Sequence, residues 1–578
     1  MKRWLRTLLL IAGTLVLLLA AWLWWNRPQP VDMAAYAPAD ALIYIEANSL
    51  PSIFNALTST DSWRALAPPA GLKTQLDQFG WLSRAAAWTG IGPVDTVVLA
   101  RAQVAIVVMG FDAAEEPEQA LHIKPRAALV VETHTSQRRA QAAVEKLIGD
   151  YVQRTYGATQ VERRQLGDVA LATWPNPRGG LPIVLAVSGS VAIIGNDEAT
   201  VQACLAVRRG ERPALTSDPQ LAEMRERMRS DEALTFGYVP TAGAHRLLAV
   251  AALAYAGRFA NDQRAQSAAA TLLPQLANRL LGGMGWSARI ESGTLTDTYF
   301  IAVPNGVPPR LRDALSAAAQ TTDGAAALLP ADVAQLTRYD FRDSAAAWRE
   351  LQAALSSQLD ITIAPFVAHF LDDALKPFGI ADPREFLRAA GPELTTVRLD
   401  ESGASPLLVA QVRDRDALRA QVKKQLGSAR MEHAGDAELW LSADEERGAA
   451  CFIGDYLLLG NADDVRRCLT ARASARTLAA DSGFAHAVTD ITTNDPAGIV
   501  TFSDEREAER AFILLLARQK VLRANNAPDD AAFKRALDER AYAVSETRPV
   551  EGGFEKRTRS AFGQFGTLAG QFINGAGG

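Results

Sequence analysis

Two stretches of this chain, Val191-Ala192-Ile193-Ile194-Gly195-Asn196 and Tyr456-Leu457-Leu458-Leu459-Gly460-Asn461, end an apolar run on the same Gly-Asn pair. An earlier stretch, Pro38-Ala39-Asp40, likewise returns as Pro330-Ala331-Asp332. The repeat distance is about 270 residues, whereas solenoid repeats have periods of roughly 20–50 residues. We therefore predict that one unit containing both helices and strands occurs twice in tandem, so that the chain has two related halves.

Within each half, short apolar runs alternate with amphipathic stretches. Gly167-Asp168 and Gly435-Asp436 are predicted to be hairpin turns between short strands. Helices are predicted at residues 50–57 and after Asp343-Ser344, where proline or a capping side chain favours a helix start. Because hairpins join antiparallel neighbours, the predicted fold class is α+β, with two tandem, pseudo-symmetric repeats and mostly antiparallel sheets.

The N-terminus has the pattern of a membrane anchor. Residues 7–25 carry no charge and follow the basic residues Lys2, Arg3 and Arg6. A run of about 19 residues is long enough to cross the hydrocarbon core as a helix, and the basic end stays in the cytoplasm. We predict a single-pass signal anchor of the bacterial inner membrane, with the C-terminal body in the periplasm. A cleaved signal peptide is the alternative, but tryptophans rather than a small-residue cleavage site end the run.

Proline and glycine clusters divide the chain into segments. The predicted divisions are 1–26, a cytoplasmic tip and transmembrane anchor; 27–37, a linker; 38–303, the first repeat; 304–328, an inter-repeat linker; 329–561, the second repeat; and 562–578, a glycine-rich C-terminal tail.

The composition is that of a folded protein. Of 578 residues, 48% are hydrophobic and 22% are charged, which is too apolar for a disordered chain. The formal net charge is −5, and the part beyond the basic N-terminus is more acidic still. An acidic body argues against a nucleic-acid partner.

No pattern of catalytic, cofactor-binding or metal-binding residues is recognisable. The six histidines include no pair at the i, i+4 spacing that places two imidazoles on one helix face, and no phosphate-binding, dinucleotide-binding or nucleophile-elbow motif is present. The turn Ser188-Gly189-Ser190 is interpreted as a hairpin rather than a nucleophile, and residues 112–118 as a solvated acidic loop rather than a calcium site. We predict no enzyme, no cofactor and no metal.

Tryptophans and cysteines leave alternatives open. The tryptophans are interpreted as core residues, with a sugar or lipid groove as the alternative. The cysteines are interpreted as small buried residues, with a Cys451–Cys468 disulfide as the alternative. These residues are Trp63, Trp81, Trp88, Trp174, Cys204, Cys451 and Cys468.

The P-A-D-A-x-x-Y opening at Pro38, the strand end at Gly195-Asn196 and the helix start at Asp481 resemble one bacterial family. That family is the exported, membrane-anchored proteins called domain of unknown function 3352. The resemblance implies an exported location and a related fold for nearly the whole part beyond the anchor. It implies no activity.

Because neither half shows a catalytic pattern, we predict a non-enzymatic binding or scaffold protein of the cell envelope, with a site at the junction of the halves. One alternative is a carrier of a lipid or other hydrophobic ligand, which predicts an apolar cavity beneath the antiparallel sheet. Another is a hydrolase, which predicts a pocket joining two titratable groups of perturbed pKa. The predicted partners are the inner membrane, through residues 7–25, and an envelope protein or a lipid.

Overall fold

The structure is a computed structural model that describes most of the chain beyond the N-terminus. The described residues are 30–73, 102–116, 119–157, 160–177, 180–256, 274–275, 278–318, 324–358, 375–380, 382–400, 406–444, 448–491, 496–518, 527–540 and 542–566. The predicted anchor over residues 7–25 lies outside them. Among the described residues, no helix combines the length and the apolar character that crossing a membrane requires.

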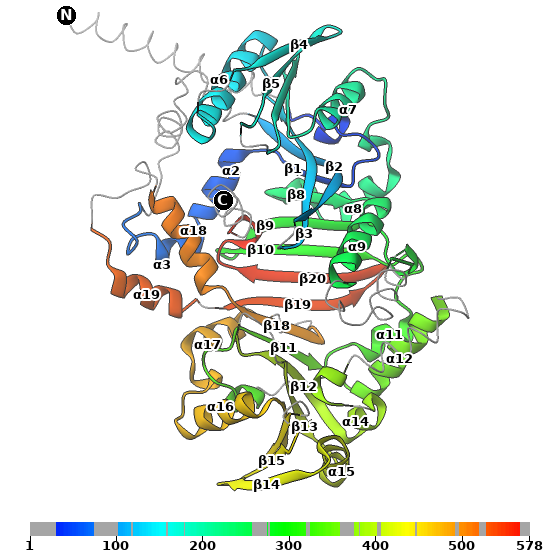
Figure 1. Ribbon diagram of the computed structural model, residues 1–578, viewed down its shortest axis with the longest axis vertical. Coiled ribbons are helices and arrows are strands. Elements are labelled where there is room, and N and C mark those ends of the chain that lie inside the picture. Colours follow the sequence, from blue (N-terminus) through cyan, green and yellow to red (C-terminus); the bar gives the residue numbers. More distant parts are fainter. Residues whose placement is uncertain are drawn as a thin grey trace, which may run out of the picture.

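One antiparallel sheet of twenty strands runs the whole length of the molecule (Figure 1). The predicted α+β class with an antiparallel sheet is therefore confirmed. The strands of the first half are β1 (Ile43–Ala47), β2 (Gln103–Glu116), β3 (Gln119–Glu132), β4 (Glu162–Leu166), β5 (Val169–Trp174), β6 (Ile183–Ser188), β7 (Val191–Gly195), β8 (Thr235–Val239), β9 (Met284–Glu291) and β10 (Thr294–Ala302).

The pairing order in this half is β4-β5-β6-β7-β3-β2-β1-β8-β9-β10. In the second half it is β14-β15-β16-β17-β13-β12-β11-β18-β19-β20, which repeats the first order strand for strand. These strands are β11 (Gln335–Asp340), β12 (Ala390–Arg398), β13 (Leu407–Val412), β14 (Ala429–Ala434), β15 (Ala437–Ser442), β16 (Ala449–Ile453), β17 (Tyr456–Gly460), β18 (Ile499–Asp504), β19 (Tyr542–Val550) and β20 (Gly553–Ser560).

The last strands of the two halves, β10 and β20, join the halves in the middle of the sheet (Figure 1). They pair antiparallel over eight residue pairs, from Leu295 opposite Ser560 to Ala302 opposite Gly553. Thr298 stands opposite Arg557, and each lies five residues after the glycine of its own hairpin turn, Gly293 or Gly552. The junction between the halves is thus a backbone hydrogen-bond ladder.

Helices cover parts of both faces of the sheet. The α-helices are α2 (Leu50–Thr58), α3 (Asp61–Leu66), α6 (Gln137–Thr155), α7 (Glu198–Arg208), α8 (Pro219–Arg227), α9 (Thr241–Ala256), α11 (Pro309–Ala314), α12 (Ser344–Gln358), α14 (Pro383–Ala389), α15 (Arg415–Leu426), α16 (Ala462–Ala473), α17 (Ser482–Thr489), α18 (Arg506–Arg518) and α19 (Asp530–Asp538); short 3₁₀ helices occupy Met33–Tyr36, Leu215–Ser217, Ser230–Glu232, Ala325–Ala327, Lys376–Phe378 and Leu478–Ala480.

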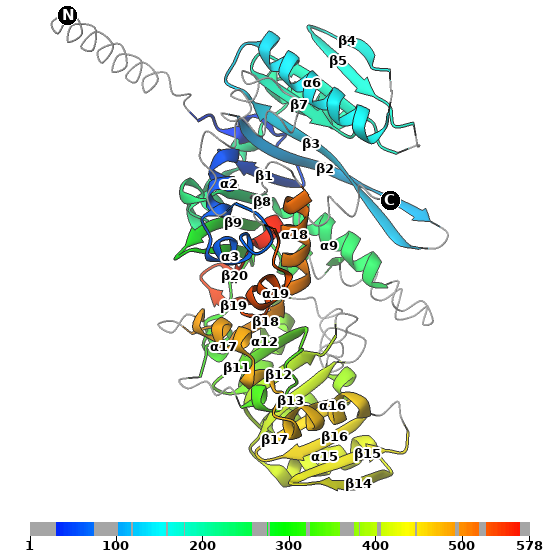
Figure 2. The same cartoon turned by 90° about the vertical axis from the view of Figure 1, so that its left-hand side faces the viewer.

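Some segments differ from the predictions. Asp112, Glu115 and Glu116, expected in a loop, belong instead to β2, which extends to Glu116 and forms with β3 a ribbon that projects from the body (Figure 2). Glu118 of the same predicted loop lies outside the described residues. The predicted inter-repeat linker 304–328 contains α11. The helix α6 runs through Gly149 to Thr155, because the residues after the glycine still place Val152 in the core.

Besides cores within each half, one apolar cluster draws on both halves. Trp63 of α3 is buried together with Phe512 of α18, Phe533 of α19 and Phe562, which follows β20. The rings of Phe512 and Phe562 lie 4.6 Å apart, and Figure 2 shows α3 beside α18 and α19. Phe562, predicted to begin a glycine-rich tail, is therefore part of this shared cluster.

Candidate ligand cavity

A cavity of about 600 Å³ lies between the sheet strands β11, β12 and β18 and the helices α12 and α14. Most of its lining is apolar. Its aromatic and aliphatic walls include Phe341, Trp348, Phe386, Leu394 and Ile499. This volume falls within the roughly 300–1,000 Å³ that is typical of small-molecule sites.

Local sequence patterns place these side chains. Strand residues alternate between the two faces of a sheet, so Thr337 and Tyr339 face the cavity while Leu336 packs in the core of the opposite face. On α12, Ser344, Trp348 and Leu351 recur at spacings of four and three residues and therefore share one helix face. Asp343 accepts a hydrogen bond from the backbone N–H of Ala346 at 2.9 Å, which fixes the predicted start of this helix.

The cavity changes in polarity along two paired strands. Gln335 stands opposite Arg398 and Thr337 opposite Thr396, whereas one step further Tyr339 stands opposite Leu394. We call the first four residues, Gln335, Thr337, Thr396 and Arg398, the polar end. All four line the cavity, and Arg398 is exposed to solvent, with its Nη1 3.4 Å from Gln335 Oε1.

Two donors in the helical wall are left without acceptors. Ser344, only 5% exposed, and Trp348 both line the cavity. Neither the hydroxyl Oγ of Ser344 nor the indole Nε1 of Trp348 has a hydrogen-bond partner among the described residues. A buried donor without a partner costs free energy, so a ligand oxygen or a water placed here would be stabilised.

A row of hydroxyl-bearing residues leads from the cavity floor across the junction. Thr337, Thr501, Ser545 and Thr558 lie opposite one another on successive strands, and Asp297 of β10 ends this row. Residues directly opposite each other in antiparallel strands point to the same face. The cavity and Asp297 therefore lie on one face of the sheet.

Asp297 is the first of three buried carboxyl groups near the junction. It is 1% exposed and accepts hydrogen bonds from Trp286 Nε1 (2.8 Å) and from the backbone N–H of Gln564 (3.0 Å). Burial raises the pKa of Asp297 to about 6, although these hydrogen bonds oppose the rise. The ring of Phe565 also packs on Trp286, so this carboxyl holds the segment after β20 against the sheet.

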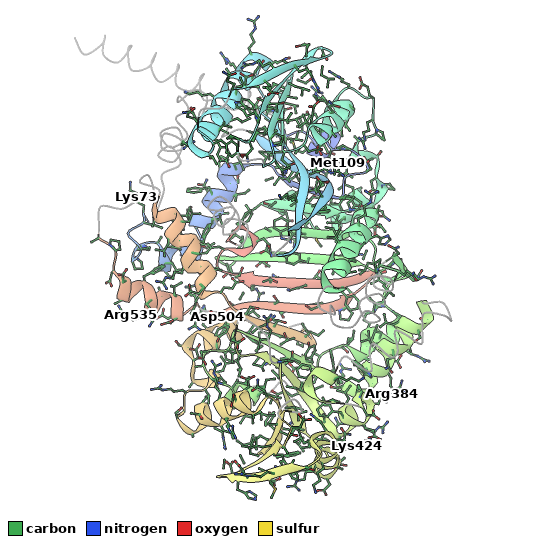
Figure 3. All side chains as sticks on the ribbon, in the orientation of Figure 1. Lys73, Met109, Arg384, Lys424, Asp504 and Arg535 are labelled. Atoms are coloured by element: carbon green, nitrogen blue, oxygen red, sulfur yellow. The ribbon has the colours of Figure 1, made fainter. Side chains whose placement is uncertain are left out.

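The other two carboxyl groups lie at the start of α18, next to Asp504 (labelled in Figure 3). Burial raises the pKa of Glu505 to about 7, and the charges of Asp297 and Asp504 raise it further. Burial, followed by the charge of Glu505, raises the pKa of Glu509 well above its usual range. Sequence reasoning did not find this group, because its members come from β10 and from the start of α18.

The three carboxyl groups lie apart from the cavity described above, because none of them lines it. In the described part of the chain, no group of three or more His, Cys, Asp or Glu residues is arranged to hold a metal ion. The hydrolase alternative stays a prediction.

The predicted hairpin at Ser188-Gly189-Ser190 is confirmed as the turn between β6 and β7. The hydroxyl of Ser190 donates to Glu132 Oε2 at 3.0 Å, and the ring of His134 contacts Gln103 Oε1 at 3.1 Å. Ser190 and His134 thus bind different partners.

The tryptophans and cysteines behave as core residues. Trp63 and Trp174 are buried in apolar clusters, while Trp81 and Trp88 lie outside the described residues. Cys204, Cys451 and Cys468 are free and buried, and burial raises their thiol pKa values to about 12, about 11 and about 12. Such thiols are almost wholly protonated near neutral pH and are weak nucleophiles.

The junction of the halves, where a site was predicted, holds a smaller cavity of about 410 Å³. It lies between α8 and the end of β10 and reaches Gly552 of the second half. Arg227 lies on its rim, but its guanidinium already donates to the Glu551 carbonyl at 3.0 Å and stacks over Phe300 at 4.3 Å.

Comparisons with known proteins found no match. No family model, no curated protein and no solved structure matches this chain.

Sequence reasoning missed the cavity residues. The sequence of β11 carries no clear signal, because its more deeply buried positions include the charged residues Arg338 and Asp340. The partners of Gln335, Thr337 and Tyr339 on β12 come more than fifty residues later, and only the strand register shows that polar residues face polar ones.

Proposed function

We propose that this chain is a non-enzymatic binding protein that takes up a lipid or other hydrophobic small molecule. The observation that supports this proposal is the apolar cavity between the sheet and α12, at the place where a hydrophobic-ligand carrier would require one. Its unpartnered donors Ser344 and Trp348 supply the few polar contacts that orient a ligand in an otherwise apolar site.

The cellular setting is part of the same proposal. The uncharged run over residues 7–25 is the basis for proposing a single-pass anchor in a bacterial inner membrane, with the body in the periplasm. We also propose that the two halves arose as tandem, pseudo-symmetric copies of one unit, as the repeated strand order supports. An anchored body beside a bilayer has ready access to hydrophobic ligands, whereas the envelope-protein partner stays a prediction.

The test uses the full-length chain in phosphatidylcholine nanodiscs and hexadecanol carrying a photoreactive diazirine in its chain. After irradiation, mass spectrometry of peptides locates the labelled residues. We expect labelling of α12 and β11, because the diazirine would lie between these two walls.

Two variants narrow the cavity. Ala347→Trp and Leu351→Trp add bulk to its helical wall, and we expect each to lower the labelling about tenfold, equivalent to about 1.4 kcal/mol. Ala346→Trp, on the same helix but outside the lining, is the matched control. Melting temperatures show which variants fold. Equal labelling of folded wild type and folded cavity variants would refute the proposal.

A further inference from the structure

We infer that the ligand is a single acyl chain with an anionic headgroup, which is held at the polar end while the chain extends toward Tyr339 and Trp348. This inference rests on the proposed function and specifies the ligand class of the same cavity.

The polarity of the cavity changes in one direction along its paired strands. The register sets Gln335 opposite Arg398 at one end of the cavity and Tyr339 opposite Leu394 four residues further along β11. A strand rises about 3.3 Å per residue, so the lining changes from charged to apolar within roughly 13 Å. A wall of this kind matches a molecule whose polar head and apolar chain are joined end to end.

The two halves differ at the polar end. The backbone N–H of Leu42 bonds to the carbonyl of Val108 in the first half, as that of Ala334 bonds to Arg398 in the second. Leu42 and Val108 therefore correspond to Ala334 and Arg398. Counting along the paired strands from these residues gives each residue of the polar end an equivalent in β1 or β2. The four residues found there are all aliphatic: Ile43, Ile45, Ile106 and Val108.

The fold therefore tolerates aliphatic residues at all four positions. Part of the polar end is satisfied within the protein, since Thr337 shares a hydrogen bond with Thr501 at 3.1 Å and Gln335 lies 3.4 Å from Arg398. The polar end is thus a local departure from the pattern of the first half, and an anionic headgroup at the exposed Arg398 would account for that departure.

The charge at the polar end and the size of the cavity suit one class of ligand. A guanidinium presents five N–H donors in one plane, which suits the oxygens of a carboxylate or a phosphate. Arg398 is exposed at the cavity mouth, where a charged headgroup keeps contact with water. A volume of about 600 Å³ suits one chain rather than a two-chain lipid.

The experiment compares two diazirine probes in the same nanodiscs, hexadecanoic acid and hexadecanol. Both probes enter the bilayer. The measured quantity is therefore the ratio of acid labelling to alcohol labelling in β11, β12 and α12. This ratio is compared between the wild type and Arg398→Gln. We expect the wild-type ratio to exceed that of Arg398→Gln about tenfold, because a charge-assisted hydrogen bond is lost. Arg398→Lys, which keeps the charge, should retain part of the ratio.

Lys424→Gln is the matched control. It removes one positive charge from α15 in the same half, and Lys424 (Figure 3) does not line this cavity. Its labelling ratio should equal that of the wild type. Melting temperatures of all variants show that each chain is folded.

The possible outcomes separate the two proposals. If neither probe labels the cavity walls, the proposed function fails and this inference fails with it. If both probes label equally, or folded Arg398→Gln keeps the wild-type ratio, the cavity binds ligands but the anionic headgroup is refuted. If the acid labels more strongly and Arg398→Gln loses this preference, competition with unlabelled hexadecanoate and with lysophosphatidate identifies the source of the anion. Displacement by either supports the inference, and displacement by neither overturns it.

Discussion

Two asparagines at equivalent strand ends make different bonds. Asn461 caps α16, since its Oδ1 accepts the backbone N–H of Asp464 at 2.6 Å. Asn196 instead binds the neighbouring strand β3, through the N–H of Ala127 and the carbonyl of Pro125, and the adjacent Asp197 caps α7. A helix begins shortly after the Gly-Asn pair in both halves, but the capping residue shifts by one position in the first half.

Removing the second cap should destabilise the protein measurably. We expect Asn461→Ala to lower the free energy of unfolding by about 1 kcal/mol, because an N–H of the first turn loses its acceptor. Asn461→Ser keeps an acceptor and places no second carboxylate beside Asp464, so it should stay within about 0.5 kcal/mol of wild type. Urea denaturation of the full-length chain measures both, and equal stability of the alanine variant would contradict the assignment.

The buried carboxyl groups predict an unusual dependence of stability on pH. Asp297 and Glu505 have pKa values of about 6 and about 7 in the folded state, above their ordinary values of 3.8 and 4.5. The folded state therefore binds their protons more tightly than the unfolded state does. Their contribution to stability is complete below the ordinary values and is lost as the pH rises through about 6 and about 7.

We expect the melting temperature of the wild type to fall between about pH 5 and about pH 8, by an amount equivalent to roughly 1–3 kcal/mol. Asp297→Asn and Glu505→Gln cannot ionise at these positions, so each should flatten the curve. Thermal melts across this range measure the slopes. If a variant has the same slope as the wild type, the pKa of that carboxyl group in the folded state is not raised.

At the scale of elements, the strand register corrects the alignment of the two halves. Matching the sequences alone places one strand two residues out. The sequence pairs Phe236 with Phe502 as equivalents, since each follows a threonine. The strand pairing makes Tyr238 the structural equivalent of Phe502. Tyr238 stands opposite Gly285 of β9, and Phe502 stands opposite Val544, which occupies the corresponding place in β19. A strand shifted by two residues presents the same face, so the apolar pattern alone does not detect the shift.

The central strand β10 offers the element-scale test. Thr298→Pro removes a backbone donor between β9 and β20, and we expect it to lower the free energy of unfolding by about 3 kcal/mol or more. Met431→Pro in β14, which pairs on one side only, should cost less. Chemical denaturation measures both variants, and an equal loss would argue against a continuous sheet.

At the scale of the whole molecule, the halves share more than one ladder. The cluster around Trp63 unites α3 of the first half with α18 and α19 of the second. Each half on its own would expose this cluster and one unpaired edge, either β10 or β20. The two halves therefore share both a strand pairing and an apolar cluster.

Fragments 1–303 and 304–578 test this interdependence. Expressed separately, each should aggregate or be digested rapidly by protease, because the shared cluster is uncovered. Expressed together, they should copurify from detergent as one complex. Two fragments that are each monomeric and protease-resistant would show that the halves fold independently.

The amino-acid sequence by itself determined the α+β class, the antiparallel hairpins, most helix starts and the repeated order of elements. These features depend on turn residues, caps and periodicities of two or about 3.6, which act between near neighbours. Only the tertiary structure decided how β10 joins β20, that Gln335 faces Arg398, and that Asp297 lies near Glu505. Those contacts join residues that are distant in the chain, so their geometry depends on register and packing across the whole sheet.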